Sequence, residues 1–265
     1  MSIIAKYNAR AAAANSLLCV GLDSQIEHLP ESFRQNALPQ FSFNRWIIEQ
    51  TAGYAAAFKA NIAFYEARGT QGLHELQLTI NYLRDRYPDI FTICDAKRAD
   101  IGSTNQAYVQ AIFDVMGFDA VTLHPYLGRE ALQPFLSRAD KGCIVLCRTS
   151  NPGAGEFQDL QVSGKPLWLV VAERVSQEWN VNDNCMLVVG ATYPDEMRQI
   201  RETVGDMTFL VPGIGAQGGD IQATMRAGLN KDGKGIIVNA SRGIIFAGSP
   251  AEAARSFRDD INAHR

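Results

Sequence analysis

The stretch that decides the fold is Ile90–Thr104, which reads IFTICDAKRADIGST. It opens with a short apolar run, as expected of a strand buried on both faces of a parallel sheet, and it ends in charged residues. A helical pattern, Asn105–Met116, follows directly. The stretch therefore predicts one strand followed by one helix, with charged side chains where the strand ends.

The same unit recurs along the chain. Apolar runs predict eight strands: Ser16–Asp23, Ala56–Ile62, Ile90–Lys97, Ala120–Pro125, Cys143–Thr149, Met186–Ala191, Thr208–Gly213 and Gly235–Ala240. Amphipathic segments predict helices between them: Asn44–Ala52, Gly72–Tyr87, Asn105–Met116, Glu130–Ala139, Trp168–Trp179, Tyr193–Val204 and Asp220–Ala227. This alternation predicts an α/β fold, a single (β/α)8 TIM barrel over residues 1–265. An open, doubly wound sheet is the competing architecture.

Bulk properties narrow the class of protein. The net charge of −3 gives no general attraction to nucleic acid or to an anionic membrane, so an anionic substrate needs a local site. The five cysteines lie in or beside apolar runs, which favours reduced thiols packed in a core. Cys143 and Cys147 would lie about 13 Å apart on a strand, too far to share a metal ion. With no signal peptide and no membrane-spanning segment apparent, we expect a cytoplasmic protein.

Charged residues occur at the ends of three predicted strands: Asp23 after the first, Lys59 in the second, and Asp95 and Lys97 in the third. In a parallel barrel these strand ends form the active-site face. Asp95 and Lys97 are two residues apart and should point to the same side. Asp100 follows in a turn and could curl back or reach a neighbouring chain. The alternative is a salt-bridged surface turn in which Asp100 caps the next helix.

Such a set of charges suggests a kind of chemistry. Asp95 and Asp100 would repel each other if both ionised without a cation nearby, and Lys59 and Lys97 offset that repulsion. An ammonium group fixed between carboxylates is both a preorganised field and a positioned proton donor. It suits a reaction in which negative charge leaves one atom and builds on another.

The loops after the last two predicted strands point to an anion site. Residues 212–220 read PGIGAQGGD and contain the glycine spacing of a dinucleotide-binding fingerprint. That fingerprint belongs to the first βα turn of an open sheet, whereas this segment follows the seventh predicted strand, so we reject a dinucleotide-binding site here. Glycine backbone N–H groups can still hold an anion. These loops form the usual phosphate site of such barrels, so we predict phosphate contacts from Gln217, Gly218, Ser241 and Arg242.

The longest predicted loop, Ser150–Lys165, follows the fifth strand. Its place on the active-site face and its length predict a lid over a substrate. At its start, Thr149 and Ser150 offer hydroxyl groups that could hold a planar ring carrying carbonyl groups.

With these residues in place, the chain from Leu17 to Phe246 resembles the orotidine 5′-phosphate decarboxylase family. The pattern Asp-x-Lys-x-x-Asp-Ile-x-x-Thr is specific to it, as is PGIGAQGGD at 212–220. The segment DAKRAD at 95–100 and the long predicted lid resemble those of the longer-chain branch of that family. The resemblance also suggests that Met1–Asn15 forms a short N-terminal helix that plugs the bottom of the barrel.

The resemblance implies a role for each matching residue. Lys97 would protonate C6 of the pyrimidine of orotidine 5′-monophosphate as carbon dioxide leaves, and Asp95 would lie close to the substrate carboxylate. Asp23 and Lys59 would bind ribose hydroxyls, Lys59 would also support the charged array, and Asn61 would be a supporting residue.

Other matches concern the pyrimidine, the phosphate and the subunits. Ser150 would contact the pyrimidine, although the neighbouring Thr149 leaves the choice of hydroxyl open. Gln217 and Arg242 would contact the phosphate, and the resemblance does not specify which backbone N–H groups also bind it. The remaining motif residues match positions that enter the neighbouring subunit's site, which implies a homodimer: Asp100, which would be catalytic, Ile101 and Thr104.

No cofactor or metal is expected. The chain has four histidines and no apparent cluster of metal ligands, so fixed charge, lid closure and phosphate binding energy would have to supply the catalysis. The nearest alternatives are magnesium-dependent keto-sugar phosphate decarboxylases and hexulose-phosphate synthases, which carry a carboxylate where this chain has Lys59. A non-catalytic phosphate-binding barrel is a third possibility. Carboxylates in the site argue against it, because they would not favour the binding of an anion.

Overall fold

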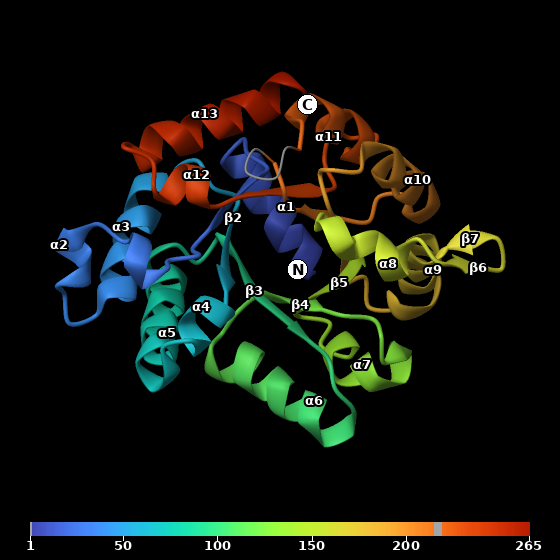
Figure 1. Cartoon of the computed structure of the whole chain (residues 1–265), viewed down its shortest axis with the longest axis horizontal. Helices are drawn as coiled ribbons and strands as arrows, with labels where there is room; N and C mark the ends of the chain where they lie inside the picture. Colours follow the sequence, from blue (N-terminus) through green and yellow to red (C-terminus); the bar gives the residue numbers. More distant parts are fainter. Residues whose placement is uncertain (1, 215–218) are drawn as a thin grey trace.

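The computed structural model describes residues 2–214 and 219–265. Within them, parallel strands close into a barrel in the order β1-β10-β9-β8-β5-β4-β3-β2, as predicted (Figure 1). The first and last strands pair directly, Leu18 with Val238, which rules out the open sheet. The barrel strands are β1 (Leu18–Gly21), β2 (Ala57–Asn61), β3 (Phe91–Arg98), β4 (Ala120–Leu123), β5 (Gly142–Arg148), β8 (Cys185–Val189), β9 (Phe209–Val211) and β10 (Ile236–Ala240).

Helices surround the barrel. They are α1 (Ile3–Ala13), α2 (Glu31–Arg34), α3 (Pro39–Thr51), α4 (Ala63–Glu66), α5 (Gly69–Arg86), α6 (Gly102–Val109), α7 (Gly128–Leu136), α8 (Gly155–Gln158), α9 (Leu167–Arg174), α10 (Pro194–Val204), α11 (Ile221–Gly228), α12 (Arg242–Ile245) and α13 (Pro250–Ala263). Two predicted helices each end in a π-helical turn, Gln110–Val115 after α6 and Val175–Trp179 after α9. The C-terminal α13 was not predicted.

Strands and helices bury an apolar core on both faces of the sheet. Most strand residues are fully buried, because helices cover the outer face and side chains fill the inside. All five cysteines are free thiols in this core, as predicted. Within the described residues, no helix combines the length and apolar character needed to cross a membrane.

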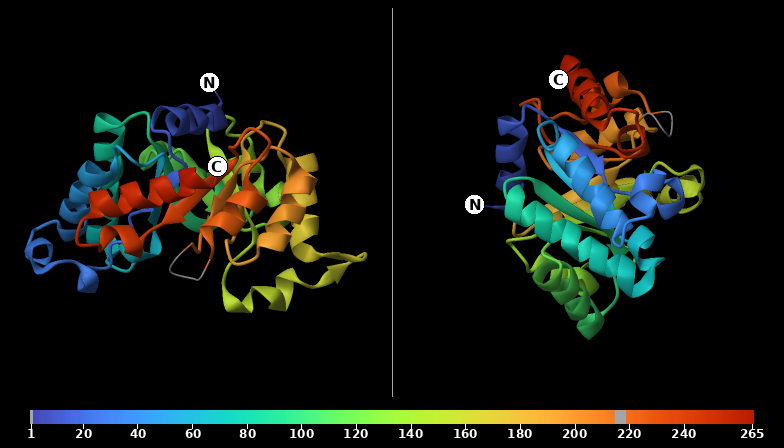
Figure 2. Two further views of the ribbon diagram at one scale, coloured as in Figure 1. Left: turned by 90° about the horizontal axis from the view of Figure 1, so that it is seen from above. Right: turned by 90° about the vertical axis from the view of Figure 1, so that its left-hand side faces the viewer.

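Helix α1 closes one end of the barrel, as expected for Met1–Asn15. Its Tyr7 is fully buried, and the Tyr7 hydroxyl donates to the carbonyl of Ile236 at 2.7 Å, where β10 begins. Lys6 pairs at 2.8 Å with Asp119, just ahead of β4. Figure 2 shows α1 at one end of the molecule and the segment around α8 at the other. The strands' carboxyl ends therefore face away from α1.

The predicted loop Ser150–Lys165 is more regular than expected. It contains a 3₁₀ turn (Pro152–Ala154), helix α8, and a hairpin formed by β6 (Gln161–Val162) and β7 (Lys165–Pro166). The hairpin turn is Ser163-Gly164, with φ of 52° and 81°. Two-residue turns with positive φ match the twist of paired strands, so this dipeptide was a hairpin signal.

Candidate active site

A cavity of about 920 Å³ opens at the carboxyl ends of the strands, on the face opposite α1. The structure brings together there most of the predicted site residues: Asp23, Lys59, Asn61, Asp95, Lys97, Thr149, Ser150, Ser241 and Arg242. Asp100, Ile101 and Thr104 are not among the residues that line it. Gln217 and Gly218 lie outside the described residues.

Asp95 is the centre of a chain of charges. Its Oδ2 accepts from Lys59 Nζ at 3.1 Å, and its Oδ1 accepts from Lys97 Nζ at 2.6 Å. Lys59 Nζ also lies 3.6 Å from Asp23 Oδ1. That Asp23 oxygen accepts the backbone N–H of Asn61 at 3.2 Å. The four predicted strand-end charges thus form one connected array rather than a surface turn.

Neighbouring charges shift the pKa values of two members of the array, Asp95 and Lys59. Burial raises the pKa of Asp95, but Lys59 and Lys97 together lower it well below its usual range. Burial lowers the pKa of Lys59, but the carboxylates of Asp23 and Asp95 hold it well above its ordinary value. The Asp95 carboxylate and the Lys59 ammonium group are therefore charged together at neutral pH.

The two lysines differ in what they can reach. The Lys59 side chain is 5% exposed and the Lys97 side chain 50% exposed. Lys97 is therefore the ammonium group that a molecule in the cavity can contact most freely, whereas Lys59 is fixed behind it.

Lys97 has an unusual backbone. Its φ is 47°, in the left-handed region that side chains with a Cβ rarely adopt. The pairing of β3 with β4 also shifts register between Cys94 and Arg98. Asp95 and Lys97 meet as predicted, but at a bulge, where the regular alternation on which that prediction rested is interrupted.

Thr122, on β4, was missed by the sequence analysis. Its Oγ1 accepts the backbone N–H of Lys97 at 2.9 Å and donates to Asp95 Oδ1 at 3.0 Å. A buried hydroxyl in an apolar strand needs a partner, and this was the only available signal. The sequence could not say that the partners would be Asp95 and Lys97.

Thr149 and Ser150, in the polar wall of the cavity, differ in their hydrogen bonds. The Thr149 hydroxyl donates to Asn151 Oδ1 at 2.7 Å and accepts from Gln158 Nε2 at 2.8 Å. Ser150 lines the cavity, and within the described part of the chain its hydroxyl makes no hydrogen bond. A Cβ at Gly190 would lie 2.7 Å from Ser150 Cβ, so this close packing requires glycine. Ser150 is thus the hydroxyl free to meet a ligand.

Arg148, at the end of β5, was also missed. It is 2% exposed, and its guanidinium lies 3.8 Å from the centre of the Tyr193 ring. The same group lies 3.4 Å from Asp159 and 3.7 Å from Glu196. Arg148 therefore ties the segment after α8 and helix α10 to the barrel wall.

The expected phosphate end is only partly described. The Ser241 hydroxyl donates to the carbonyl of Gly21 at 3.1 Å, so it can only accept from a ligand. A Cβ at Gly21 would lie 2.8 Å from Ser241 Cβ, which explains the glycine at the end of β1. Arg242 is exposed at the cavity rim and, among the described residues, forms no ion pair. Its guanidinium is available to an anion.

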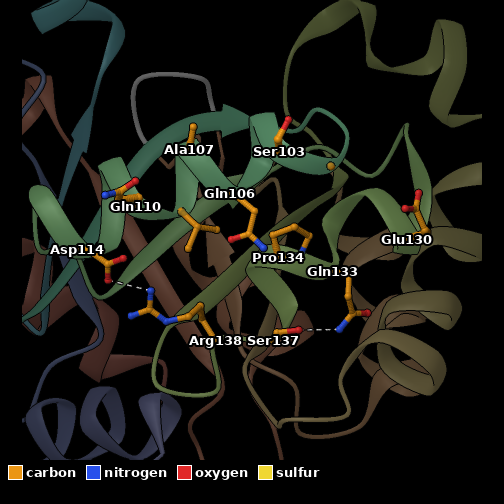
Figure 3. Close-up of a pocket in the computed structure, with 12 residues that line it drawn as sticks. Ser103, Gln106, Ala107, Gln110, Asp114, Glu130, Gln133, Pro134, Ser137 and Arg138 are labelled. Atoms are coloured by element: carbon orange, nitrogen blue, oxygen red, sulfur yellow. Dashed lines mark hydrogen bonds and ion pairs between the residues drawn. The ribbon is translucent and has the colours of Figure 1, made fainter.

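A second hollow, of about 830 Å³, lies between α6 and α7 (Figure 3). Gly102 and Ser103, within the sequence motif that runs from Asp95 to Thr104, line it. Asn105, fully buried, accepts the N–H of Asp100 at 2.9 Å and donates to the carbonyls of Asp100 and Ala131. The Asp100 turn is thereby fixed, and Ile101 beside it is 61% exposed. Asp100 is not the helix cap, because α6 begins after Ile101.

Across residues 2–214 and 219–265, no group of three or more His, Cys, Asp or Glu side chains is arranged to hold an ion.

Comparison with known proteins places this site in a family. Residues 16–257 match the family described as orotidine 5′-phosphate decarboxylase / HUMPS. The chain is 46% identical to an orotidine 5′-phosphate decarboxylase of Cellvibrio japonicus over the full length of both proteins. It is 48% identical to that of Ralstonia nicotianae, covering 95% of this chain and 94% of the relative.

A solved structure agrees. The OMP decarboxylase of Leishmania donovani superposes with a TM-score of 0.90 at 41% identity, covering 100% of this chain and 99% of that one. The similarity in sequence and in fold includes the strands that carry the charged array and line the cavity. The chain belongs to the orotidine 5′-phosphate decarboxylase / HUMPS family.

Proposed function

We propose that this enzyme converts orotidine 5′-monophosphate to UMP, in pyrimidine biosynthesis, by fixed charges and without a metal or organic cofactor. The observation that carries the proposal is the Asp95 carboxylate, ionised between Lys59 and Lys97, with Lys97 half exposed to the cavity. The names of close relatives over the whole chain support the substrate. Lys59 argues against the sugar-phosphate enzymes of the same family, which carry a carboxylate at that position.

The proposed reaction needs one bond to break and one to form. The bond between C6 of the pyrimidine and the carboxylate carbon breaks, carbon dioxide leaves, and the electron pair stays on C6. Lys97 then delivers a proton to C6 and regains one from water. Asp95 places a negative charge beside the substrate carboxylate, and this unfavourable contact is relieved as neutral carbon dioxide departs. The Lys97 ammonium stabilises the charge that builds on C6.

The remaining cavity residues would bind the rest of the nucleotide. Asp23 and Lys59 would hold the ribose hydroxyls, with Asn61 in support. Ser150 would contact the pyrimidine, because the Thr149 hydroxyl is already engaged within the protein. The phosphate would be held by Gln217, Gly218, Ser241 and Arg242.

We further propose a homodimer in which Asp100, Ile101 and Thr104 serve the partner's cavity. These residues do not line their own cavity, and Ile101 is 61% exposed. Two more large apolar side chains are exposed in the segments next to α6 and α7, Val115 at 63% and Tyr126 at 89%. Large apolar side chains that one chain exposes can be covered by a second copy of it, and this supports the proposed dimer.

An assay of orotidine 5′-monophosphate loss, followed by absorbance in the presence of a chelator, tests the proposed function. We expect full turnover with chelator and no added metal. The decarboxylation proposal fails if the nucleotide is not consumed. The cofactor-free proposal fails if turnover stops with chelator and returns with magnesium.

A further inference from the structure

We propose that Thr122 is a positioning residue that sets where the Lys97 ammonium group lies relative to Asp95. This inference rests on the proposed function, because it concerns the residue assigned there as the proton donor. Thr122 is fully buried and acts through its two hydrogen bonds, to the Lys97 backbone and to the Asp95 carboxylate.

The direction of both hydrogen bonds is fixed by chemistry. A backbone N–H can only donate, so Thr122 Oγ1 must accept from Lys97. An ionised carboxylate can only accept, so the single hydroxyl proton must go to Asp95 Oδ1. Asp95 Oδ1 therefore accepts hydrogen bonds from both the Thr122 hydroxyl and the Lys97 ammonium group, and Asp95 Oδ2 accepts one from Lys59. The hydroxyl closes a small ring through the backbone and side chain of Lys97 and the Asp95 carboxylate.

Lys97 needs this support because its backbone is strained. A left-handed residue with a side chain persists only where its surroundings hold it, at a cost on the order of 1 kcal/mol. The register shift in β3 leaves the Lys97 N–H without a regular strand partner, and Thr122 supplies one from β4. Without that acceptor, the bulge can relax toward an ordinary strand, and the half-exposed Lys97 side chain would change direction.

The barrel contains a matched control at its other end. Thr92, on β3, donates to Asp119 Oδ2 at 3.1 Å and accepts the backbone N–H of Asp119 at 3.1 Å. Asp119 is also paired with a lysine, Lys6, at 2.8 Å. Like Thr122, Thr92 accepts one backbone N–H and donates to one carboxylate, here both of Asp119, and it does not line the cavity. Loss of either hydroxyl should cost similar stability, but only Thr122 should affect chemistry.

The experiment compares Thr122→Val, Thr122→Ser and Thr92→Val by kcat and KM for orotidine 5′-monophosphate and by urea unfolding. For Thr122→Val we expect kcat to fall on the order of 100-fold with KM within about threefold, since misplacing a reacting group by about 1 Å costs that much. Thr122→Ser keeps the hydroxyl and should recover most of the loss. Thr92→Val should keep kcat within about twofold while unfolding as readily as Thr122→Val.

Several results would overturn the inference. These are a Thr122→Val kcat close to that of the parent, an equal loss of kcat in Thr92→Val, or no recovery in Thr122→Ser. If Thr122→Val does not fold, Thr122→Ala replaces it, because alanine removes the hydroxyl without adding bulk. The same fall in kcat is then expected of Thr122→Ala. Failure of the unmodified enzyme to consume the nucleotide would instead refute the proposed function, so the two failures are distinguishable.

Discussion

At the scale of single residues, Lys59 is held in a nearly dry position by Asp95 at 3.1 Å and Asp23 at 3.6 Å. A buried charge is tolerated only while its partners remain. In Asp95→Asn, the remaining ion pair of Lys59 would be the longer one, with Asp23. We therefore expect this variant to lose about 3 kcal/mol of unfolding free energy at pH 7, because removing one partner of a buried pair strands the other.

The pH dependence of that loss has a defined sign. The pKa of Asp95 is lowered on folding, so its contribution is complete above the unfolded value of about 3.9 and declines as the pH falls below it. Urea unfolding should show the difference between parent and Asp95→Asn shrinking below about pH 4. Asp85→Asn, whose side chain is 65% exposed, is the control and should change little. A loss that grows toward acid pH would contradict this account.

Single residues also show the limit of sequence reasoning at the site. The charges of the array were predictable, because charged residues at the ends of apolar strands share one face of a barrel. The roles of Thr122 and Arg148 were not, because each depends on which strand or loop lies beside it. The left-handed Lys97 was equally hidden, since no local signal marks a bulge held by a neighbouring strand.

At the scale of elements, Gln158 attaches α8 to the end of β5. Its Oε1 accepts the Thr149 N–H at 2.9 Å, and its Nε2 donates to the Thr149 hydroxyl at 2.8 Å. Gln158→Ala should loosen residues 152–166 and speed proteolysis there, and kcat/KM should fall about tenfold because the proposed lid loses its anchor. Limited proteolysis and steady-state kinetics measure both effects.

Lys165→Ala serves as the control for that element. Its ion pair with Glu173 lies on the surface, with the lysine side chain 51% exposed, and does not touch β5. It should leave both proteolysis and kinetics nearly unchanged. Equal behaviour of the two variants would show that the Gln158 contacts do not hold the segment.

Helix α1 makes a contrasting prediction at the opposite end. Tyr7→Phe removes the buried hydrogen bond to the Ile236 carbonyl and should lower the unfolding free energy by about 1–2 kcal/mol. Helix α1 lies at the end of the molecule opposite the segment around α8 (Figure 2) and does not line the cavity, so kcat should stay at the parent value. Chemical denaturation and a turnover assay test this, and a loss of kcat without a loss of stability would contradict it.

Elements were predicted in proportion to the strength of their patterns. The barrel strands are buried on both faces and appear as apolar runs, so all were found with ends within two residues. The segment Ser150–Lys165 was predicted to be a loop because its helix and hairpin are too short to show a periodic pattern. The π-helical turns after α6 and α9 were invisible for a similar reason, since their side chains still follow a helical pattern.

At the scale of the whole molecule, we propose one domain over residues 1–265, since β1 near the start pairs with β10 near the end. The proposed dimer places Lys97 and Asp100 of each cavity on different subunits. Lys97→Ala and Asp100→Ala should each abolish turnover alone. Co-expressed, they should regain about one quarter of the parent activity, because half of the dimers are mixed and each has one intact site.

Sedimentation of the mixture should show a dimer whenever activity returns. An inactive mixed dimer would contradict the shared site, as would activity in Asp100→Ala alone.

The central claim is that Lys97 supplies both charge and proton in a cofactor-free decarboxylation. Turnover of orotidine 5′-monophosphate by Lys97→Ala, measured with the unfolding curve of the same sample, tests it most directly. We expect kcat to fall by at least about 1,000-fold while the protein stays folded, because the remaining Lys59 is buried behind Asp95. Near-normal turnover in folded Lys97→Ala would contradict the mechanism.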